Sequence, residues 1–354
     1  VRPLSSGFFG GGTPSLFGAA ALGRVLEHAS RRLGFESVIE ITLEANPGTA
    51  EAGRFRGYRV AGVNRLSIGV QSFEDSHLRA LGRIHGRDEA LAAVRMARDD
   101  AGFEHLNLDL MFALPAQTPE QALADLDTAI ALQPGHLSWY HLTVEPNTEF
   151  AARPPARLPD ADTAAMLHDA GCARLAAAGY AQYETSAFAQ AGRSCRHNLN
   201  YWQFGDYLGI GAGAHGKRSL PAATARRVDD DLDDLDDNGE GEGEGVVAGL
   251  RIERRARHKH PRTFMAHAGT AAAIQERRLL SAAELPFEFC MNALRLHRGV
   301  PRSMFAQRTG LHDAVLRRPL REALRLGLVE TGGDRLMPSV AGCRHQNRLL
   351  ELFL

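Results

Sequence analysis

Three polar residues stand at the ends of strand-like segments whose other residues are mostly apolar: Glu44, Gln71 and Asp109. A buried carboxylate is costly unless it is paired, so an acidic residue in such a place usually has a partner or a ligand. For each residue alone, a structural hydrogen bond to a neighbouring loop explains the position equally well. Because the three follow successive segments, with Arg83 in the next loop, we expect them together to form a cage for a polar ligand.

A glycine turn, GGGTP at 10–14, follows the strand-like SGFF and precedes a helix-like stretch. Glycines at a strand end let the backbone approach a ligand closely, and their N–H groups can hold its polar atoms. A plain turn without a ligand is the alternative. The spacing matches neither G-x-G-x-x-G nor a P-loop, so the turn does not indicate a nucleotide phosphate site.

Five segments that could position these residues repeat one pattern: a β-rich run, a polar or glycine-bearing turn, then a helical stretch. A period of roughly thirty residues is what βα units need. The alternation predicts an α/β fold with a parallel sheet that is closed or partly closed into a barrel, and the strand-end residues would line one mouth of it. The turns lie at 10–14, 44–47, 69–73, 107–115 and 142–146.

The sequence changes character in its second part. Residues 229–245 hold ten acidic residues with scattered glycine, which predicts a solvated, disordered insertion, or alternatively a tail for a basic partner. From about residue 281, short helices and a strand-like end predict a winged-helix-like module without a helix that would read nucleic acid. We expect three parts: a barrel domain over 1–220, an acidic then basic linker over 221–262, and a helical domain over 263–354.

Composition narrows the classes of function. The 41 basic and 42 acidic residues leave a formal charge of −1, which argues against general affinity for nucleic acid or anionic lipid. Four scattered cysteines form no disulfide framework, and no apolar run reaches the roughly 18 to 20 residues of a membrane span. We therefore expect a cytoplasmic protein that is not an integral membrane protein.

The order and spacing of several segments resemble a known family. GGGTPSLF, EITLEANPGT, NRLSIGVQSF, LRALGRIHGRDEA and NLDLMFALPAQT are similar to the core of the radical S-adenosylmethionine (SAM) family that includes oxygen-independent coproporphyrinogen III oxidase. The block SCRHNLNYWQFGDYLGIGAGAHG and the later ELPFEFCMNALRL resemble its HemW-type haem-chaperone branch. The resemblance implies a partial TIM-like barrel of the radical SAM type with a helical C-terminal domain.

The resemblance also implies cofactors. These proteins hold a [4Fe–4S] cluster on a C-x-x-x-C-x-x-C loop after their first strand. None of the four cysteines here recreates that spacing, so we expect the sequence to begin after this loop and to hold no cluster in the family manner. The positions that match the family's SAM site are Gly10, Gly11, Gly12, Thr13, Glu44, Gln71, Arg83, Asp109 and Thr143.

In the haem-chaperone branch an H-N-x-x-Y segment is associated with haem binding, and here it consists of His197, Asn198 and Tyr201. An imidazole is a good axial ligand for haem iron, so His197 is the expected ligand, with Tyr201 and Trp202 offering flat surfaces to the porphyrin. A histidine that simply packs in the protein is the alternative. Cys195 is a weaker candidate ligand, and His215 is expected to be structural.

These observations favour a haem chaperone that binds haem and delivers it to haem-accepting proteins, some of them membrane-associated. One alternative is a porphyrin-biosynthesis enzyme, the oxygen-independent coproporphyrinogen III oxidase, which would act through a 5′-deoxyadenosyl radical. The scattered cysteines make radical chemistry by this chain doubtful. A regulatory protein that works through its winged-helix-like end is a further alternative.

Overall fold

A computed structural model describes residues 3–48, 53–146, 148–221, 249–330 and 333–354, so the acidic stretch at 229–245 lies outside the described residues. The chain divides into two compact units, Val1–His197 and Asn198–Leu354. The division falls inside one short helix, α9 (Arg196–Trp202).

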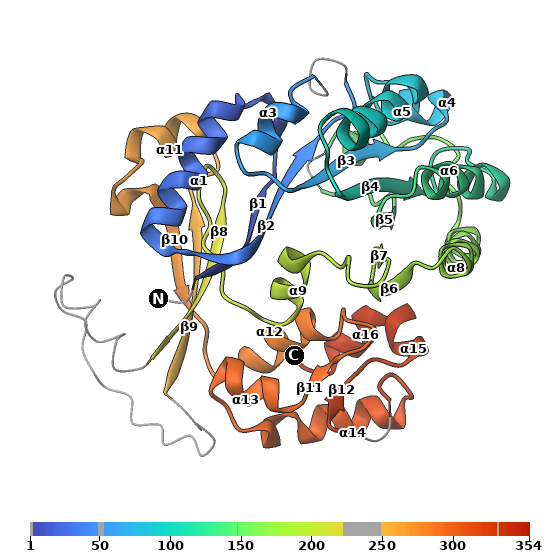
Figure 1. The fold of residues 1–354 in the computed structure, drawn as a ribbon. Helices are drawn as coiled ribbons and strands as arrows, with labels where there is room; N and C mark the ends of the chain where they lie inside the picture. Colours follow the sequence, from blue (N-terminus) through green and yellow to red (C-terminus); the bar gives the residue numbers. More distant parts are fainter. Residues whose placement is uncertain (1–2, 49–52, 147, 222–248, 331–332) are drawn as a thin grey trace. The chain divides into compact units, whose positions relative to one another are not determined.

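A curved seven-stranded sheet forms the centre of the first unit (Figure 1). Its strands lie in the order β1-β2-β3-β4-β5-β7-β6; the first five are parallel, and β7 pairs antiparallel with both β5 and β6. The parallel part follows the predicted βα repeat, with each strand ending at or near one of the predicted turns. The strands are β1 (Leu4–Phe9), β2 (Phe35–Ala45), β3 (Arg65–Gln71), β4 (His105–Phe112), β5 (His136–His141), β6 (Ala181–Glu184) and β7 (Ala187–Ala189).

Helices connect these strands. Helix α6 shows why they begin where they do, because Thr118 and Gln121 form a reciprocal capping box around Pro119 at its first turn. The helical elements of this unit are η1 (Pro14–Leu16), α1 (Ala19–Leu33), α3 (Phe55–Val60), α4 (Asp75–Ala80), α5 (Arg87–Arg95), the π-helix η2 (Met96–Asp100), α6 (Pro119–Ala131), α7 (Glu149–Ala152) and α8 (Ala161–Ala177).

Successive side chains of each strand point to opposite faces of the sheet, so core residues lie on one face and site residues on the other. In β3, Leu66, Ile68 and Val70 are fully buried and join a core cluster that includes residues of α1, while the residues between them face the other side of the sheet. The same alternation in β4 and β5 sends large apolar residues to the helices. Polar side chains are thereby collected on the inner face of the curved sheet.

The second unit contains a three-stranded antiparallel sheet, β10-β9-β8, and a helical module with a two-stranded ribbon, β11–β12. Its strands are β8 (His215–Pro221), β9 (Leu250–Arg257), β10 (Ile274–Leu279), β11 (Val300–Pro301) and β12 (Arg335–Leu336). Its helices after α9 are α11 (Pro261–His267), η3 (Ala271–Ala273), α12 (Leu285–Ala293), α13 (Ser303–Thr309), η4 (Asp313–Leu316), α14 (Arg317–Arg325), α15 (Val340–Arg344) and α16 (Gln346–Glu351).

These boundaries differ from the domain limits expected from sequence. The sequence placed the end of the barrel domain at 220, whereas β8 pairs along its whole length with β9 and belongs to the second unit. The expected helical domain began at 263, but β10 joins the same sheet as β8 and β9. Long-range strand pairing, which is invisible in local patterns, moves both limits.

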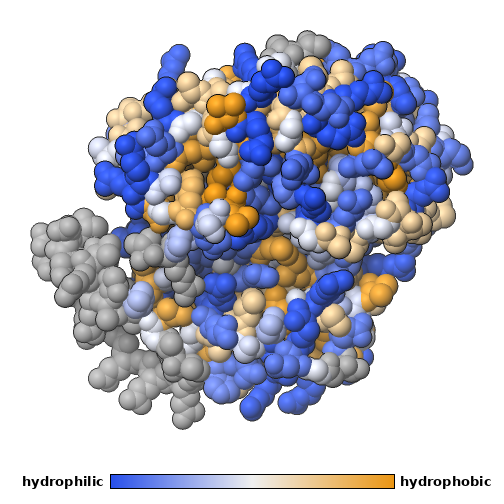
Figure 2. Space-filling view, viewed as in Figure 1, coloured by the Kyte–Doolittle hydropathy of each residue, from blue (hydrophilic) through white to orange (hydrophobic). Residues whose placement is uncertain are grey.

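The α/β partial barrel and the helical C-terminal module are the fold class expected from the sequence. Figure 2 shows hydrophilic residues and small hydrophobic patches interspersed over the face in view. Among the described helices, none combines the length and the apolar character that crossing a membrane requires.

Candidate functional site

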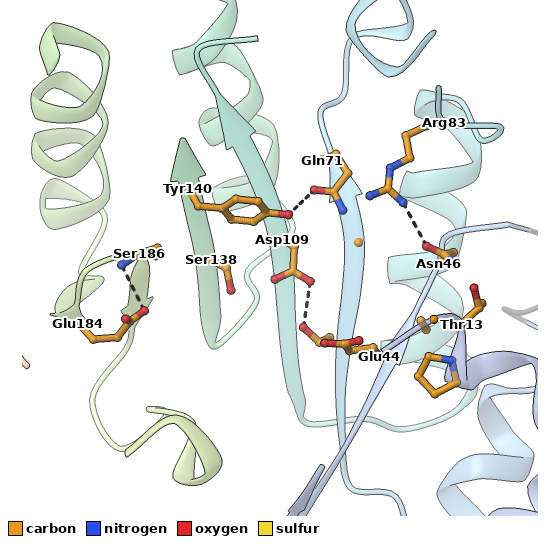
Figure 3. Close-up of a pocket in the computed structure, with 15 residues that line it drawn as sticks. Thr13, Glu44, Asn46, Gln71, Arg83, Asp109, Ser138, Tyr140, Glu184 and Ser186 are labelled. Carbon is orange, nitrogen blue, oxygen red and sulfur yellow. Dashed lines mark hydrogen bonds between the residues drawn. The ribbon is translucent and has the colours of Figure 1, made fainter. Parts of the chain in front are cut away.

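A polar cavity of about 430 Å³ opens at the carboxyl-terminal side of the parallel strands (Figure 3). Parallel strands deliver their carboxyl ends to one edge of the sheet, which is where barrel proteins carry their sites. The volume falls within the range of small-molecule sites. The lining residues are Gly12, Thr13, Pro14, Glu44, Ala45, Asn46, Ser67, Gly69, Gln71, Arg83, Asp109, Ser138, Tyr140, Glu184 and Ser186.

The glycine turn after β1 packs against Glu44. The Gly11 N–H donates to Glu44 Oε2 at 3.1 Å. A Cβ at Gly10 would lie 2.6 Å from a Phe8 ring carbon and 3.1 Å from the Glu44 carboxyl carbon, so a side chain there would clash. Burial raises the pKa of Glu44, the Gly11 bond opposes this, and the nearby Asp109 raises the pKa further.

Asp109 forms the floor of the cavity. Its two carboxylate oxygens accept hydrogen bonds from Ser67 Oγ at 3.0 Å and from Asn107 Nδ2 at 2.8 Å. Burial raises the pKa of Asp109, and the hydrogen bonds from Ser138, Asn107 and Ser67 counteract part of this effect. The carboxylate is therefore held as an acceptor that can take a further donor from a ligand.

Gln71 has an unusual backbone for a residue with a side chain, with φ at 70°. Its side-chain oxygen accepts from the Tyr140 hydroxyl at 2.7 Å (Figure 3). The next two residues are held by Asp125 of α6, which accepts from Ser72 Oγ and from the Phe73 N–H, each at 2.7 Å. A strained backbone that is fixed by its surroundings is typical of ligand sites.

Arg83 lies at the rim of the cavity. Its guanidinium donates to Asn46 Oδ1 at 3.5 Å, a long bond that leaves most of its donors for a ligand (Figure 3). The cavity therefore presents three carboxyl groups, those of Glu44, Asp109 and Glu184, with several hydroxyl and amide groups and one cation. This donor set suits a ligand that carries both an amine and a carboxylate, as well as hydroxyl groups.

The structure brings most of the predicted cage residues together. Gly12, Thr13, Glu44, Gln71, Arg83 and Asp109 all line the cavity. Gly10 and Gly11 belong to the same turn without lining it. Thr143 is exposed, donates to Glu145 at 3.2 Å and is not among the lining residues.

Sequence reasoning missed several lining residues, including Asn46, Ser67, Ser138 and Tyr140. The two-residue period of the strands signalled three of these. Ser67 lies four residues before Gln71 in β3, so both share one face of the sheet. In β5, Ser138 and Tyr140 alternate with buried apolar residues. Glu184 ends β6 and Ser186 lies in the turn between β6 and β7, and neither carried such a signal.

The predicted haem segment is helical and its histidine is partly buried. The His197 ring stacks on the Phe8 ring of β1, with centroids 4.4 Å apart and planes inclined by 22°. Burial lowers the pKa of His197 to about 4, and the charge of Arg65 acts in the same direction. The imidazole is therefore neutral at physiological pH, which is the form that binds iron.

The aromatic residues of this segment contact other side chains of the second unit. Tyr201 stacks on Tyr207 with ring centroids 4.2 Å apart, and the Arg295 guanidinium lies 4.3 Å from the centre of the Trp202 ring. Their faces are thus at least partly covered by protein in this conformation. His215 is exposed in β8.

The cysteines do not form a cluster site. Cys195 and Cys290 are buried, and Cys172 and Cys343 are partly buried. Within the described ranges there is no group of three or more Cys, His, Asp or Glu side chains that could hold a metal ion. The thiols of this chain therefore do not fit a [4Fe–4S] cluster.

Family comparisons agree with this geometry. A model of the Radical SAM superfamily matches residues 3–129, and a model of the HemN C-terminal domain matches residues 280–344. The solved coproporphyrinogen III oxidase (HemN) from Escherichia coli is similar over 99% of this chain and 78% of its own, with a TM-score of 0.75 and 21% identity. That likeness concerns the fold, which is the half-barrel of radical SAM proteins.

Named relatives narrow the class of radical SAM protein to which this chain belongs. The haem chaperone HemW of Haemophilus influenzae is 44% identical over 353 residues, which span 100% of this chain and 84% of the relative. HemW of Escherichia coli K12 is 45% identical, over 100% of this chain and 85% of the relative. A mitochondrial radical SAM domain-containing protein 1 of Mus musculus is 44% identical over 63% of this chain and 51% of its own. The chain belongs to the HemW family of radical SAM proteins.

Proposed function

We propose that this protein is a haem chaperone, which binds haem in the cytoplasm and delivers it to haem-accepting proteins, some of them membrane-associated. The observation that carries the proposal is the identity of 44–45% to two relatives named as haem chaperones, over the whole of this chain. The fold alone would not support it, because related folds host different activities.

His197 is the proposed axial ligand of the haem iron. Its neutral imidazole offers the lone pair that iron needs, and burial keeps it neutral. In the described conformation the ring contacts Phe8, so iron binding requires a nitrogen at the ring edge rather than the stacked face. Asn198 and Tyr201 complete the proposed haem segment on the same helix.

The polar cavity is the proposed SAM site. The residues fit the molecule: the glycine turn allows close approach, Arg83 matches a carboxylate, and Glu44 and Asp109 match ammonium and hydroxyl donors. When bound, SAM supplies a sulfonium group whose cleavage in radical SAM enzymes needs an adjacent cluster. The role proposed for the cavity is to bind SAM.

The oxidase alternative has weaker support. The solved oxidase shares only 21% identity with this chain, so the likeness extends to the fold and not to its reaction. Haem binding without decarboxylation is the outcome that we expect from the purified protein.

The test is a haem titration followed through the Soret band. His197→Ala removes the proposed axial bond, so we expect affinity to fall about tenfold or more, roughly 1.4 kcal/mol, and the Soret maximum to shift. His215→Ala, an exposed histidine in β8, is the matched control and should behave like the parent. An unchanged spectrum and affinity for His197→Ala would refute the ligand assignment, and absence of haem binding by the parent chain would refute the function.

A further inference from the structure

A continuous series of buried and partly buried hydrogen bonds runs beneath the polar cavity, entirely within the first unit. It starts at Asp109 on the cavity floor, which accepts from Asn107 Nδ2 at 2.8 Å. Asn107 Oδ1 lies 2.6 Å from His136 Nδ1, and His136 Nε2 lies 2.8 Å from the Tyr183 hydroxyl. The Tyr183 oxygen in turn accepts from the backbone N–H of Cys195 at 3.4 Å.

The donors and acceptors along this chain have one consistent direction. Asn107 Oδ1 can only accept, so His136 Nδ1 must carry the proton. His136 Nε2 is then the acceptor for the Tyr183 O–H, and the Tyr183 oxygen accepts from the Cys195 N–H. Every donor therefore points toward Asp109, a carboxylate that only accepts while it is ionised.

Burial of its central members makes this series of hydrogen bonds stiff. Asn107 and His136 are each 2% exposed, and both lie on paired parallel strands, β4 and β5. Burial lowers the pKa of His136 well below its usual value, so the ring keeps the neutral tautomer that the chain requires. In a low-dielectric interior, hydrogen bonds in series strengthen one another, and a change at one end is felt along the series.

The far end of the chain is the start of the haem segment. Cys195 directly precedes α9, and Glu40 Oε1 accepts from the backbone N–H groups of Arg196 at 2.9 Å and His197 at 3.4 Å. Tyr183 and Glu40 thus accept from the three successive N–H groups of residues 195–197, which lead into the haem segment at His197. Phe8 makes a second link between the cavity and the haem segment, because its ring stacks on His197 and lies against the Gly10 turn.

We propose that Tyr183 is a positioning residue for the haem segment, and that it couples this segment to the state of Asp109 in the cavity. A ligand whose hydroxyl or ammonium group donates to Asp109, as SAM would, then changes haem affinity without touching haem. The proposal rests on the proposed function, because it concerns the regulation of haem binding at His197. Coupling of this kind is reciprocal, so haem also changes affinity for the ligand.

The test is a double-mutant cycle on the full chain. Asp109→Asn keeps the shape of the side chain but puts donors where the network needs an acceptor. We expect amide hydrogen exchange of residues 195–197 to rise, and haem affinity to fall, by about fivefold or more. In the Tyr183→Phe background, where the link is already cut, Asp109→Asn should add less than about twofold to either quantity.

Tyr180→Phe is the matched control. It also removes one hydroxyl from a buried tyrosine of the first unit, but that hydroxyl donates to the Pro134 carbonyl and not to the network. In its background Asp109→Asn should keep its full effect. Thermal unfolding checks that all variants fold. If the Asp109→Asn variant does not fold, Asp109→Ser replaces it.

Two results would overturn the coupling: an Asp109 effect that persists undiminished with Tyr183→Phe, or no effect of Asp109 substitution on exchange at residues 195–197. The exchange measurement needs no haem, so it decides the coupling even if the parent chain fails to bind haem. Loss of haem binding by the parent refutes the proposed function instead.

Discussion

Asp125 supports the candidate site without lining it, because its carboxylate holds the two residues that follow the strained Gln71. Burial raises the pKa of Asp125 to about 6, and the hydrogen bonds from Ser72 and Phe73 only partly oppose this. A carboxyl group whose pKa is raised by folding stabilises the fold fully below its unfolded pKa, and that contribution is lost as pH rises through the folded pKa.

Asp125→Asn should remove this pH dependence. Between about pH 4 and pH 7, we expect the free energy of unfolding of the parent to fall relative to the variant by up to about 3 kcal/mol. Urea unfolding at several pH values measures both proteins. Parallel pH profiles of the two would show that Asp125 does not titrate in this range in the folded protein.

SAM binding by the chain should be weak. The cavity offers side-chain partners, but the cysteines do not fit the cluster whose open iron would hold the amino and carboxylate groups of the cofactor. We expect a dissociation constant well above about 1 μM, and a further loss for Asp109→Ala. Calorimetry that finds binding at about 1 μM or tighter would contradict this expectation.

Two glycines that lie in helices should respond in opposite ways to substitution by alanine. A Cβ at Gly171 of α8 would lie 1.7 Å from the ring of Trp139, a residue that is only 1% exposed. A Cβ at Gly23 of α1 would lie 3.7 Å from the Ala61 Cβ and 4.0 Å from the Ala61 Cα, which are ordinary contact distances. The same substitution therefore tests packing at one site and helix propensity at the other.

Gly171→Ala should destabilise the protein by about 1 to 3 kcal/mol through overpacking. Gly23→Ala should leave the stability unchanged or raise it by up to about 1 kcal/mol, because alanine favours the helix. Thermal or urea unfolding of both variants gives the comparison. Equal effects of the two substitutions would mean that α8 shifts away from the sheet and that its packing on Trp139 is loose.

For the whole molecule, reconstitution with iron and sulfide under anaerobic conditions should yield no stable [4Fe–4S] cluster on this 354-residue chain. Two cysteines lie in each unit, at 172 and 195 and at 290 and 343, and two of the four are buried. Iron and sulfide analysis and the visible spectrum give the measurement. About four irons and four sulfides per chain, with the matching absorption shoulder, would contradict it.

Sequence by itself determined the parallel βα order, and with it the edge where polar residues gather. Each strand end is marked locally by an apolar run that meets glycine, acid or amide residues, so Glu44, Gln71 and Asp109 are identifiable from residue order alone. The glycine turn is equally visible because its residue types report backbone freedom directly. These features depend only on neighbours in the sequence.

Only the tertiary structure decided which distant side chains complete the site. Tyr140 reaches Gln71 and Tyr183 reaches Cys195 because strand pairing and sheet curvature bring them together, and Thr143 stays outside the cavity for the same reason. The limit of the first unit moved from 220 into α9 because β8 pairs with a strand that begins at residue 250. Pairing between distant segments is set by the free energy of the whole fold, and no local pattern records it.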